Sequence, residues 1–410
     1  MTRGAVVAAG MATALGPLPA RGDAFAATAT PAPAGVAWED GIITYAGPAE
    51  GLPWEPDLGS PGSGCLVPGF VDAHVHLPFY GWRADEFEAR LLGASYRDLH
   101  GEEGGIFRSS RMLREASDDA VVAFCRPLLD QMLDHGTTSV ELKTGYGLSV
   151  EEELRAARLA RRLGREAAQT VRVTLLACHA VPAGMTRADW VRTACNELIP
   201  EAAKLGLADQ VDVYVEDIAF TVDDLAAVAE AATRWGLPLR VHADQLGPSG
   251  ATEAAVGLGA RSADHLNNCS PAGVAALAES PGTVAMLLPA STFFLRTNRP
   301  PVQALREQGA AIAIATDFNP GTSPICSMPE AIAMAATLYG STPLETLTAA
   351  TANPAWVLGL TDRGTLEPGK RADILLLEEP SFAQVPYRPG HNPVTNTFVA
   401  GLMVSGSTSA

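Results

Sequence analysis

The sequence lacks the features that mark membrane, disulfide-rich and zinc-ribbon proteins. It has no uninterrupted apolar run of the ~20 residues that a membrane-crossing helix needs, and none of its six cysteines stand in CxxC spacing. Charged residues make up only 18% and aromatic residues 6% of the 410 residues, whereas 47% are apolar. Scattered cysteines in a long, apolar chain are typical of reduced, buried thiols in the cytosol. We therefore expect a cytoplasmic, well-buried globular protein.

Basic residues are also scarce. The chain has 29 Lys and Arg against 46 Asp and Glu, a formal net charge of −17. This balance disfavours nucleic acid and anionic membrane surfaces as partners. An anionic small-molecule substrate stays compatible with it, because a local arginine outweighs charges that lie beyond the screening length.

The N-terminal run at residues 5–18 allows two interpretations. It is small and weakly apolar after Arg3, and Ala24-Phe-Ala-Ala27 has the form of a cleavage site, as in a secretory signal. Gly10, Gly16 and Pro17 interrupt the run, which favours the first strand of a folded domain instead.

Eight short apolar runs alternate with amphipathic segments from Val67 onward. The runs are Phe70–His76, Ser139–Lys143, Val173–Cys178, Val211–Glu216, Leu239–Ala243, Ser262–His265, Val284–Pro289 and Ala311–Asp317. The helical segments between them include Asp118–His135, Ser149–Leu163, Ala188–Leu205 and Thr221–Trp235. The pattern predicts an α/β fold, a (β/α)8 TIM barrel.

Both ends of the chain have a different pattern. Val36–Gly47, Ala372–Glu378 and Thr397–Val404 are strand-like runs joined by glycine-containing turns. We expect a small, β-sandwich-like domain from residues 1–66 plus 366–410, and the barrel from residues 67–365.

Polar residues that can do chemistry recur where the predicted strands end. They are His74, His76, Tyr146, His179, Glu216, His242, His265 and Asp317. A barrel brings the C-terminal ends of its strands to one face, where its active sites lie. A single histidine is more often a satisfied core or surface side chain, but five of the eight histidines fall at these positions.

Four of these side chains form a candidate metal-ligand set. His74 and His76, at i and i+2, are expected on one face of a strand. His242 and Asp317 end the fifth and eighth predicted strands. Three imidazole nitrogens and one carboxylate suit a catalytic zinc or iron ion. His265 is expected beside the ion, where it holds and deprotonates water.

Several motifs carry a family resemblance over nearly all of residues 36–404. Pro68-Gly-Phe-Val-Asp-Ala-His-Val-His76 and Gly364–Asp373 resemble the amidohydrolase superfamily. Four further segments resemble the imidazolonepropionase family within it: Arg83–Phe87, Lys143–Leu148, His179–Pro182 and Thr316–Thr322.

The resemblance implies hydrolysis of 4-imidazolone-5-propanoate to N-formimidoyl-glutamate, a step of histidine degradation. It carries over His74, His76, His242 and Asp317 as ligands of one divalent or trivalent metal ion, Zn or Fe. It implies substrate contacts for Arg83, Tyr96, Tyr146, His179, Gln245, Asn319, Gly321 and Thr322. Catalytic roles fall to His265, Asp317 and His179. We also expect a homodimer.

The residue types suit this substrate, a planar cyclic amide with a propionate tail. The Arg83 guanidinium can grip a carboxylate through paired hydrogen bonds; the alternative is a surface salt bridge with Asp85 or Glu86. His179 can donate to the developing oxyanion, and Asp317 or His265 can pass a proton to the leaving ring nitrogen.

Three positions depart from the family or superfamily pattern. Trp82 lies in a bulky segment, Leu77–Arg83, and is expected to narrow the pocket. Gln245 stands where the family also has glutamate, so it can orient the ring but cannot act as a base. Lys143 ends a strand where other amidohydrolases carry a carboxylated lysine; without a second ligand set, we expect a structural role for it.

Two rival functions remain open. One is a related mononuclear amidohydrolase, a deaminase of an aminated heterocycle or of formiminoglutamate. The other is a catalytically inactive barrel that acts as a binding protein, which the complete ligand set disfavours.

Overall fold

Eight parallel strands form the central sheet of this computed structural model, which describes residues 2–30, 32–94 and 104–406. They follow chain order across the sheet: β8 (Phe70–Asp72), β9 (Thr137–Lys143), β10 (Thr170–Cys178), β11 (Gln210–Val215), β12 (Leu239–Ala243), β13 (Ser262–His265), β14 (Val284–Leu287) and β15 (Ile312–Ile314). A parallel bridge between Val75 and Phe318 joins the two ends of the sheet. The predicted barrel is confirmed, with one strand in each predicted run.

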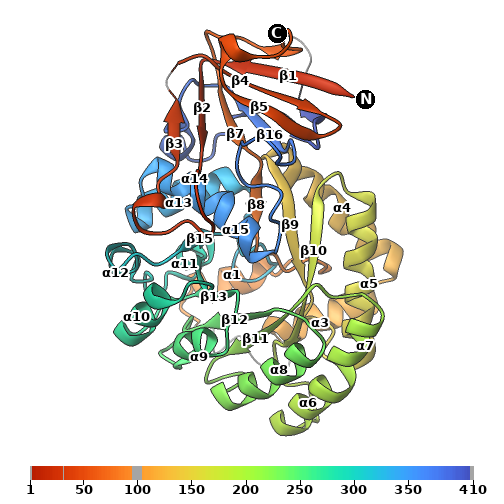
Figure 1. The fold of residues 1–410 in the computed structure, drawn as a ribbon. Coiled ribbons are helices and arrows are strands. Elements are labelled where there is room, and N and C mark those ends of the chain that lie inside the picture. Colours follow the sequence, from red (N-terminus) through yellow and green to blue (C-terminus); the bar gives the residue numbers. More distant parts are fainter. Residues whose placement is uncertain (1, 31, 95–103, 407–410) are drawn as a thin grey trace.

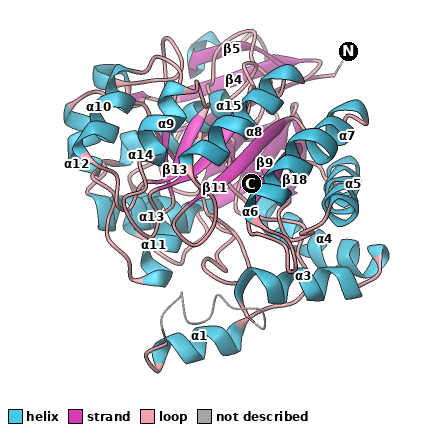
Figure 2. Cartoon of the chain, turned by 90° about the horizontal axis from the view of Figure 1, so that it is seen from below, coloured by secondary structure: helices cyan, strands magenta, loops and turns pink. Residues whose placement is uncertain are grey.

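Helices surround these strands (Figure 2). They are α1 (Ala84–Leu91), α3 (Gly105–Glu115), α4 (Asp118–Asp134), α5 (Val150–Glu166), α6 (Arg187–Thr193), α7 (Ile199–Lys204), α8 (Val222–Arg234), α9 (Ala251–Gly257), α10 (Pro271–Glu279), α11 (Pro289–Leu295), α12 (Val302–Glu307), α13 (Met328–Tyr339), α14 (Pro343–Ala350), α15 (Ala352–Val357) and α16 (Gln384–Tyr387). None of the helices in the described ranges is long and apolar enough to cross a membrane.

One predicted helix is interrupted. Between α6 and α7 the chain forms a π-helical turn at Ala194–Leu198. Pro200 follows in the first turn of α7. Because proline has no N–H to donate to the carbonyl four residues earlier and its ring collides with that carbonyl, the helix widens there.

Two further sheets lie together at one end of the barrel, where Figure 1 shows the red N-terminal and blue C-terminal segments. One sheet has the order β5 (Ile42–Pro48), β4 (Ala34–Glu39), β1 (Arg3–Ala8), β6 (Leu58–Gly59). The other has the order β18 (Leu402–Gly406), β17 (Val394–Val399), β16 (Ile374–Leu377), β7 (Cys65–Pro68), β2 (Gly10–Thr13), β3 (Thr28–Thr30). The Trp38 and Phe398 rings, 5.5 Å apart, join the two sheets.

The N-terminal run is part of this fold. Residues 3–13 supply β1 and β2, and Val6 and Ala8 are fully buried in the apolar core between the two terminal sheets. The division at residues 66/67 and 365/366 stays a prediction, and β7 continues to Pro68.

Candidate metal centre and active site

Four ligand atoms converge at the C-terminal end of the barrel. The His76 Nε2 lies 3.2 Å from His74 Nε2 and 3.4 Å from His242 Nε2. Asp317 Oδ1 lies 3.5 Å from His74 Nε2 and 3.3 Å from His76 Nε2. Ligands at ~2.0–2.1 Å from a tetrahedral ion are about 3.3 Å from one another. The observed spacings therefore fit one such ion.

The protonation pattern also fits a cation. The His74 Nδ1–H donates to Asp264 Oδ2 at 2.6 Å, and the His242 Nδ1–H donates to Asp212 at 3.1 Å. Burial lowers the pKa of His74 well below its usual range, so the ring is neutral. The Nε2 lone pair of His74 then faces the Nε2 of His76, 3.2 Å away. A cation bound by both rings accounts for this close approach.

Unpartnered polar atoms surround the same point. Asp317 Oδ2 and His265 Nδ1 are buried and have no hydrogen-bond partner within the described chain. Such atoms are rare in protein interiors and mark an ion or a ligand that completes them. Two groups of potential ligands, which share His74, each have their ligand atoms within 4.8 Å of one another. One is His74, His76 and Asp317, and the other is His74, His242 and His265.

The two histidines of the HxH motif do not lie on a regular strand, contrary to the prediction. Strand β8 ends at Asp72, whose carboxylate accepts from both the N–H and the hydroxyl of Thr316. The Thr316 N–H therefore donates to a side chain and not to a backbone carbonyl. This interrupts the backbone hydrogen bonding between the end of β8 and the residues after β15. The backbone stays extended through the Val75 bridge, so both rings still point to the ion site.

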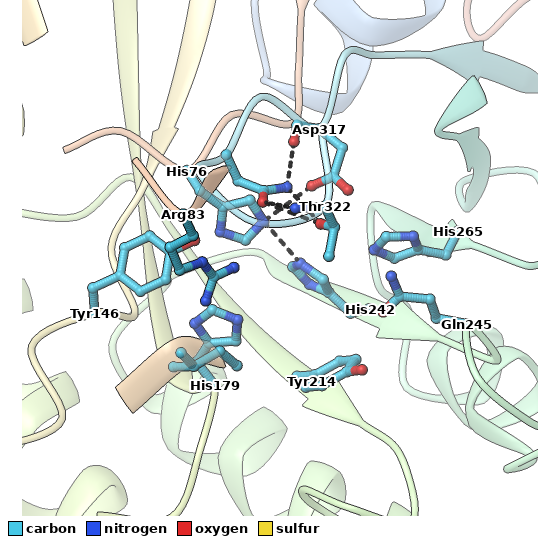
Figure 3. A pocket seen from close by; sticks show the side chains of 12 residues that line it. His76, Arg83, Tyr146, His179, Tyr214, His242, Gln245, His265, Asp317 and Thr322 are labelled. Carbon is cyan, nitrogen blue, oxygen red and sulfur yellow. Dashed lines mark hydrogen bonds and ion pairs between the residues drawn. The ribbon is translucent and has the colours of Figure 1, made fainter. Parts of the chain in front are cut away.

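The cavity above the candidate ion site is lined almost entirely by predicted residues. Its lining is His76, Arg83, Ile106, Tyr146, His179, Tyr214, His242, Gln245, His265, Asp317, Asn319 and Thr322 (Figure 3). His74 is fully buried and does not line it. Tyr96 falls outside the described residues. Trp82 is not among the lining residues and packs on Phe79 and Phe124, so it does not narrow the cavity.

Sequence reasoning missed Ile106 and Tyr214. A signal for Tyr214 was present in the strand pattern, because it pairs in register with His242 across β11 and β12. Paired residues in neighbouring strands face the same side of the sheet. Ile106 comes from α3, and no strand pattern indicates it.

Arg83 projects into the cavity with unused hydrogen-bonding capacity. Its side chain is only 3% exposed, and its Nε and Nη1 have no hydrogen-bond partner among the described residues. The Glu86 carboxylate lies 3.6 Å from Nε, an ion-pair distance, while Asp85 pairs with Arg108. A buried guanidinium with free N–H groups can still receive a carboxylate.

The loop after β15 is held together by the Asn319 amide. Its Oδ1 accepts from the N–H groups of Gly321 and Thr322, and its Nδ2 donates to the Asp317 carbonyl and to Thr322 Oγ1. Both of its donor hydrogens are used within the loop. The substrate contact of Asn319 therefore stays a prediction. In the structure its amide stabilises the turn through hydrogen bonds within the loop.

His179 is fixed in one tautomer. Its Nδ1–H donates to the Gly145 carbonyl at 2.9 Å, so in the neutral ring Nε2 carries a lone pair. It can donate to an oxyanion only when the ring also carries a proton at Nε2. Gly145 permits this approach, because a Cβ there would lie 2.8 Å from the His179 Nδ1.

Comparisons with known proteins decide the family. Residues 65–406 match the amidohydrolase family. The imidazolonepropionase of Rhizorhabdus wittichii is 44% identical over 373 residues, which are 90% of this chain and 93% of that protein. The imidazolonepropionase of Paracoccus denitrificans is 43% identical over 89% of this chain and 93% of that protein. The chain belongs to the imidazolonepropionase branch of the amidohydrolase family.

Solved structures agree with this amidohydrolase fold. A triazine hydrolase variant superposes with a TM-score of 0.73 at 14% identity, covering 98% of this chain and 95% of that chain. The guanine deaminase of E. coli gives a TM-score of 0.72 at 16% identity, covering 98% of this chain and 99% of that chain. At these identities the likeness shows the barrel alone. The amidohydrolase family is metal-dependent, in agreement with the ligand cluster.

In this amidohydrolase, Glu216 holds the loop after β12 and gives a pH-dependent prediction. Its Oε1 accepts from the N–H groups of Gln245 and Leu246. Burial raises the pKa of its carboxyl to about 7. At pH values between the pKa of glutamate in the unfolded chain and about 7, the Glu216 carboxyl is protonated in the folded chain and ionised in the unfolded chain. The folded chain then binds one more proton. This group therefore lowers the unfolding free energy as the pH rises, by up to ~1.4 kcal/mol per pH unit.

Glu216→Gln keeps an acceptor oxygen and removes the titration. We expect the unfolding free energy of the variant, relative to the parent chain, to increase as the pH is raised from 5 to 7. Urea unfolding at several pH values measures this difference. A difference that stays constant with pH would contradict a titrating carboxyl at this position.

Gly321 gives a second prediction, because the Arg83 guanidinium lies against it. A Cβ at Gly321 would fall only 1.2 Å from Arg83 Nη2. Gly321→Ala must therefore displace the Arg83 guanidinium from its present position. We expect the KM for 4-imidazolone-5-propanoate to rise at least ~10-fold and the metal content to stay unchanged. Steady-state kinetics and metal analysis check both parts. An unchanged KM would show that the position of Arg83 does not matter for binding.

Proposed function

We propose that this chain opens the ring of 4-imidazolone-5-propanoate by hydrolysis to N-formimidoyl-glutamate, as the names of its curated relatives indicate. The observation that carries the proposal is that the Arg83 guanidinium, whose Nε and Nη1 have no hydrogen-bond partner among the described residues, lies in the same cavity as the candidate ion site (Figure 3). One end of the cavity can bind the propionate tail, and the other holds the reacting ring.

We propose His74, His76, His242 and Asp317 as the residues that would hold one zinc or iron ion. When bound, such an ion acts as a Lewis acid that polarises a carbonyl group and lowers the pKa of water. The ligand set accepts either metal.

Side chains of the protein would bind the attacking water and transfer its proton. Burial lowers the pKa of His265 to about 3, so its ring is neutral at pH 7 and can hold the attacking water by accepting a hydrogen bond from it. The carbonyl carbon gains the water oxygen, and its bond to the ring nitrogen breaks. Burial raises the pKa of the Asp317 carboxyl, and its Oδ2 has no hydrogen-bond partner in the described chain. This oxygen can take the proton that the attacking water loses and pass it to the leaving nitrogen.

The remaining lining residues would orient the ring. Gln245 offers an amide and Tyr146 an aromatic face. His179 would accept an N–H from the ring through its Nε2 lone pair, or stabilise the oxyanion when doubly protonated.

Turnover of 4-imidazolone-5-propanoate, followed through loss of the ring chromophore, tests the proposal. Purified protein should convert it to the ring-opened product, lose activity with a chelator and regain it with Zn²⁺ or Fe²⁺. Release of ammonia from an aminated heterocycle, with no ring opening of the imidazolone, would favour a deaminase instead.

We further propose a cytoplasmic homodimer that does not bind nucleic acid. The six cysteines form no disulfide, and five of them are buried, which suits a reducing compartment. Leu91, Leu92 and Phe293 are exposed by 53%, 85% and 56%, which leaves apolar surface for a second copy.

A further inference from the structure

Five charged side chains fill the barrel beneath the candidate ion site. They are Glu141 and Lys143 on β9, Asp212 on β11, Arg240 on β12 and Asp264 on β13, and all are 0% exposed. The interior of such a barrel is usually packed with branched apolar residues. Buried ion pairs are often no more stabilising than apolar residues of the same size. Stability alone therefore gives no reason for this network.

The first half of the network reaches His74. The carboxylate that accepts its Nδ1–H, Asp264, also accepts from the Arg240 Nη2 at 2.7 Å. Arg240 is anchored in turn by its Nη1, which donates to Glu141 Oε1 at 2.7 Å.

The second half reaches His242. Its Nδ1–H donates to Asp212, and the Lys143 Nζ donates to that carboxylate at 2.6 Å. Lys143 also forms an ion pair with Glu141 Oε2 at 3.0 Å. Glu141 thus bridges the two cations, and the contacts run without a break from His74 to His242. The Nδ1 of His76, by contrast, has no hydrogen-bond partner in the described chain.

We propose that Arg240, Glu141 and Lys143 are positioning residues that hold Asp264 and Asp212 as a rigid pair. That pair fixes the Nδ1–H tautomer of His74 and His242 and directs both Nε2 lone pairs at one ion. Lys143 serves here as an ammonium counter-ion. This inference rests on the proposed metal site and specifies how the protein tunes it.

Glu141→Gln tests the proposal, because it keeps the shape of the bridge and removes its charge. Competition with a chelator gives the Kd for Zn²⁺, and the visible spectrum of the Co²⁺-loaded protein reports the ligand geometry. We expect the Zn²⁺ Kd to rise 10–100-fold, as for the loss of groups that support metal ligands, and the Co²⁺ bands to shift. Arg240→Met and Lys143→Met should weaken binding similarly, and the double variant should cost less than the sum of the two.

Arg363→Met is the matched control. Arg363 is also buried and pairs with Asp373 at 3.2 Å, but it contacts Ser139 and Thr170 at the beginnings of β9 and β10. It should lower thermal stability and leave the Zn²⁺ Kd unchanged.

Three results would overturn the proposal: a Zn²⁺ Kd of Glu141→Gln within twofold of the parent chain, an equal loss of affinity in Arg363→Met, or failure of Glu141→Gln to fold. If the parent protein binds Zn²⁺ but does not open the imidazolone ring, the proposed function is refuted. The Zn²⁺ Kd values of the variants can still be compared in that case.

Discussion

His242→Ala is expected to release the metal ion and to lower kcat/KM at least ~10³-fold, because Lewis-acid activation of water is lost with the ion. His242 supplies one of three imidazole nitrogens at the candidate site, 3.4 Å from the Nε2 of His76. The variant loses one of the four protein ligands proposed for the ion, so we expect it to hold the ion less tightly than the parent chain does. Elemental analysis of the purified variant and turnover of 4-imidazolone-5-propanoate measure the two losses.

Gln245→Glu is the control for this prediction. Gln245 lines the same cavity but is not one of the four proposed ligands. The variant should keep its metal content even if its kcat changes. Equal metal occupancy in the two variants would contradict the ligand assignment of His242.

Arg83→Ala is expected to raise KM for the propionate-bearing substrate by roughly 100-fold, with a smaller change in kcat. A charge-assisted hydrogen-bonded contact to a buried group contributes about 3 kcal/mol, which corresponds to that factor. The effect should be confined to ligands with a carboxylate. An imidazolone without the propionate tail should therefore be bound equally by the variant and the parent chain.

Arg108→Ala controls for a general loss of positive charge at this rim. Its side chain is 29% exposed and pairs with Asp85, so its removal should change KM less than twofold. If Arg83→Ala leaves KM unchanged, or if both variants raise it equally, Arg83 does not bind the tail.

The barrel could be predicted because its strands are short, apolar runs separated by amphipathic helices. Each of the eight runs overlaps one observed strand, although β9, β10 and β11 begin one to three residues before their runs. The start of α5 was equally readable, because Ser149 and Glu152 stand in the spacing of a helix capping box. In the structure the Ser149 hydroxyl accepts from the Glu152 N–H. Once the barrel is assumed, its geometry brings His74, His76, His242 and Asp317 to one face.

Features set by tertiary contacts could not be read from local pattern. The early end of β8 depends on a bond between Asp72 and Thr316, which are far apart in the sequence. The internal use of the Asn319 amide depends on how its loop folds. The charges beneath the ion site are separated by up to 123 positions, so no local motif links Glu141 to Asp264.

Anomalous X-ray scattering from a crystal of the purified protein, measured on both sides of the zinc and iron absorption edges, would locate the ion and identify it. We predict one peak per chain, about 2.0–2.2 Å from the Nε2 atoms of His74, His76 and His242 and from Asp317 Oδ1. The absence of a peak in active protein, or a peak away from these four atoms, would contradict the metal-dependent mechanism proposed for this chain.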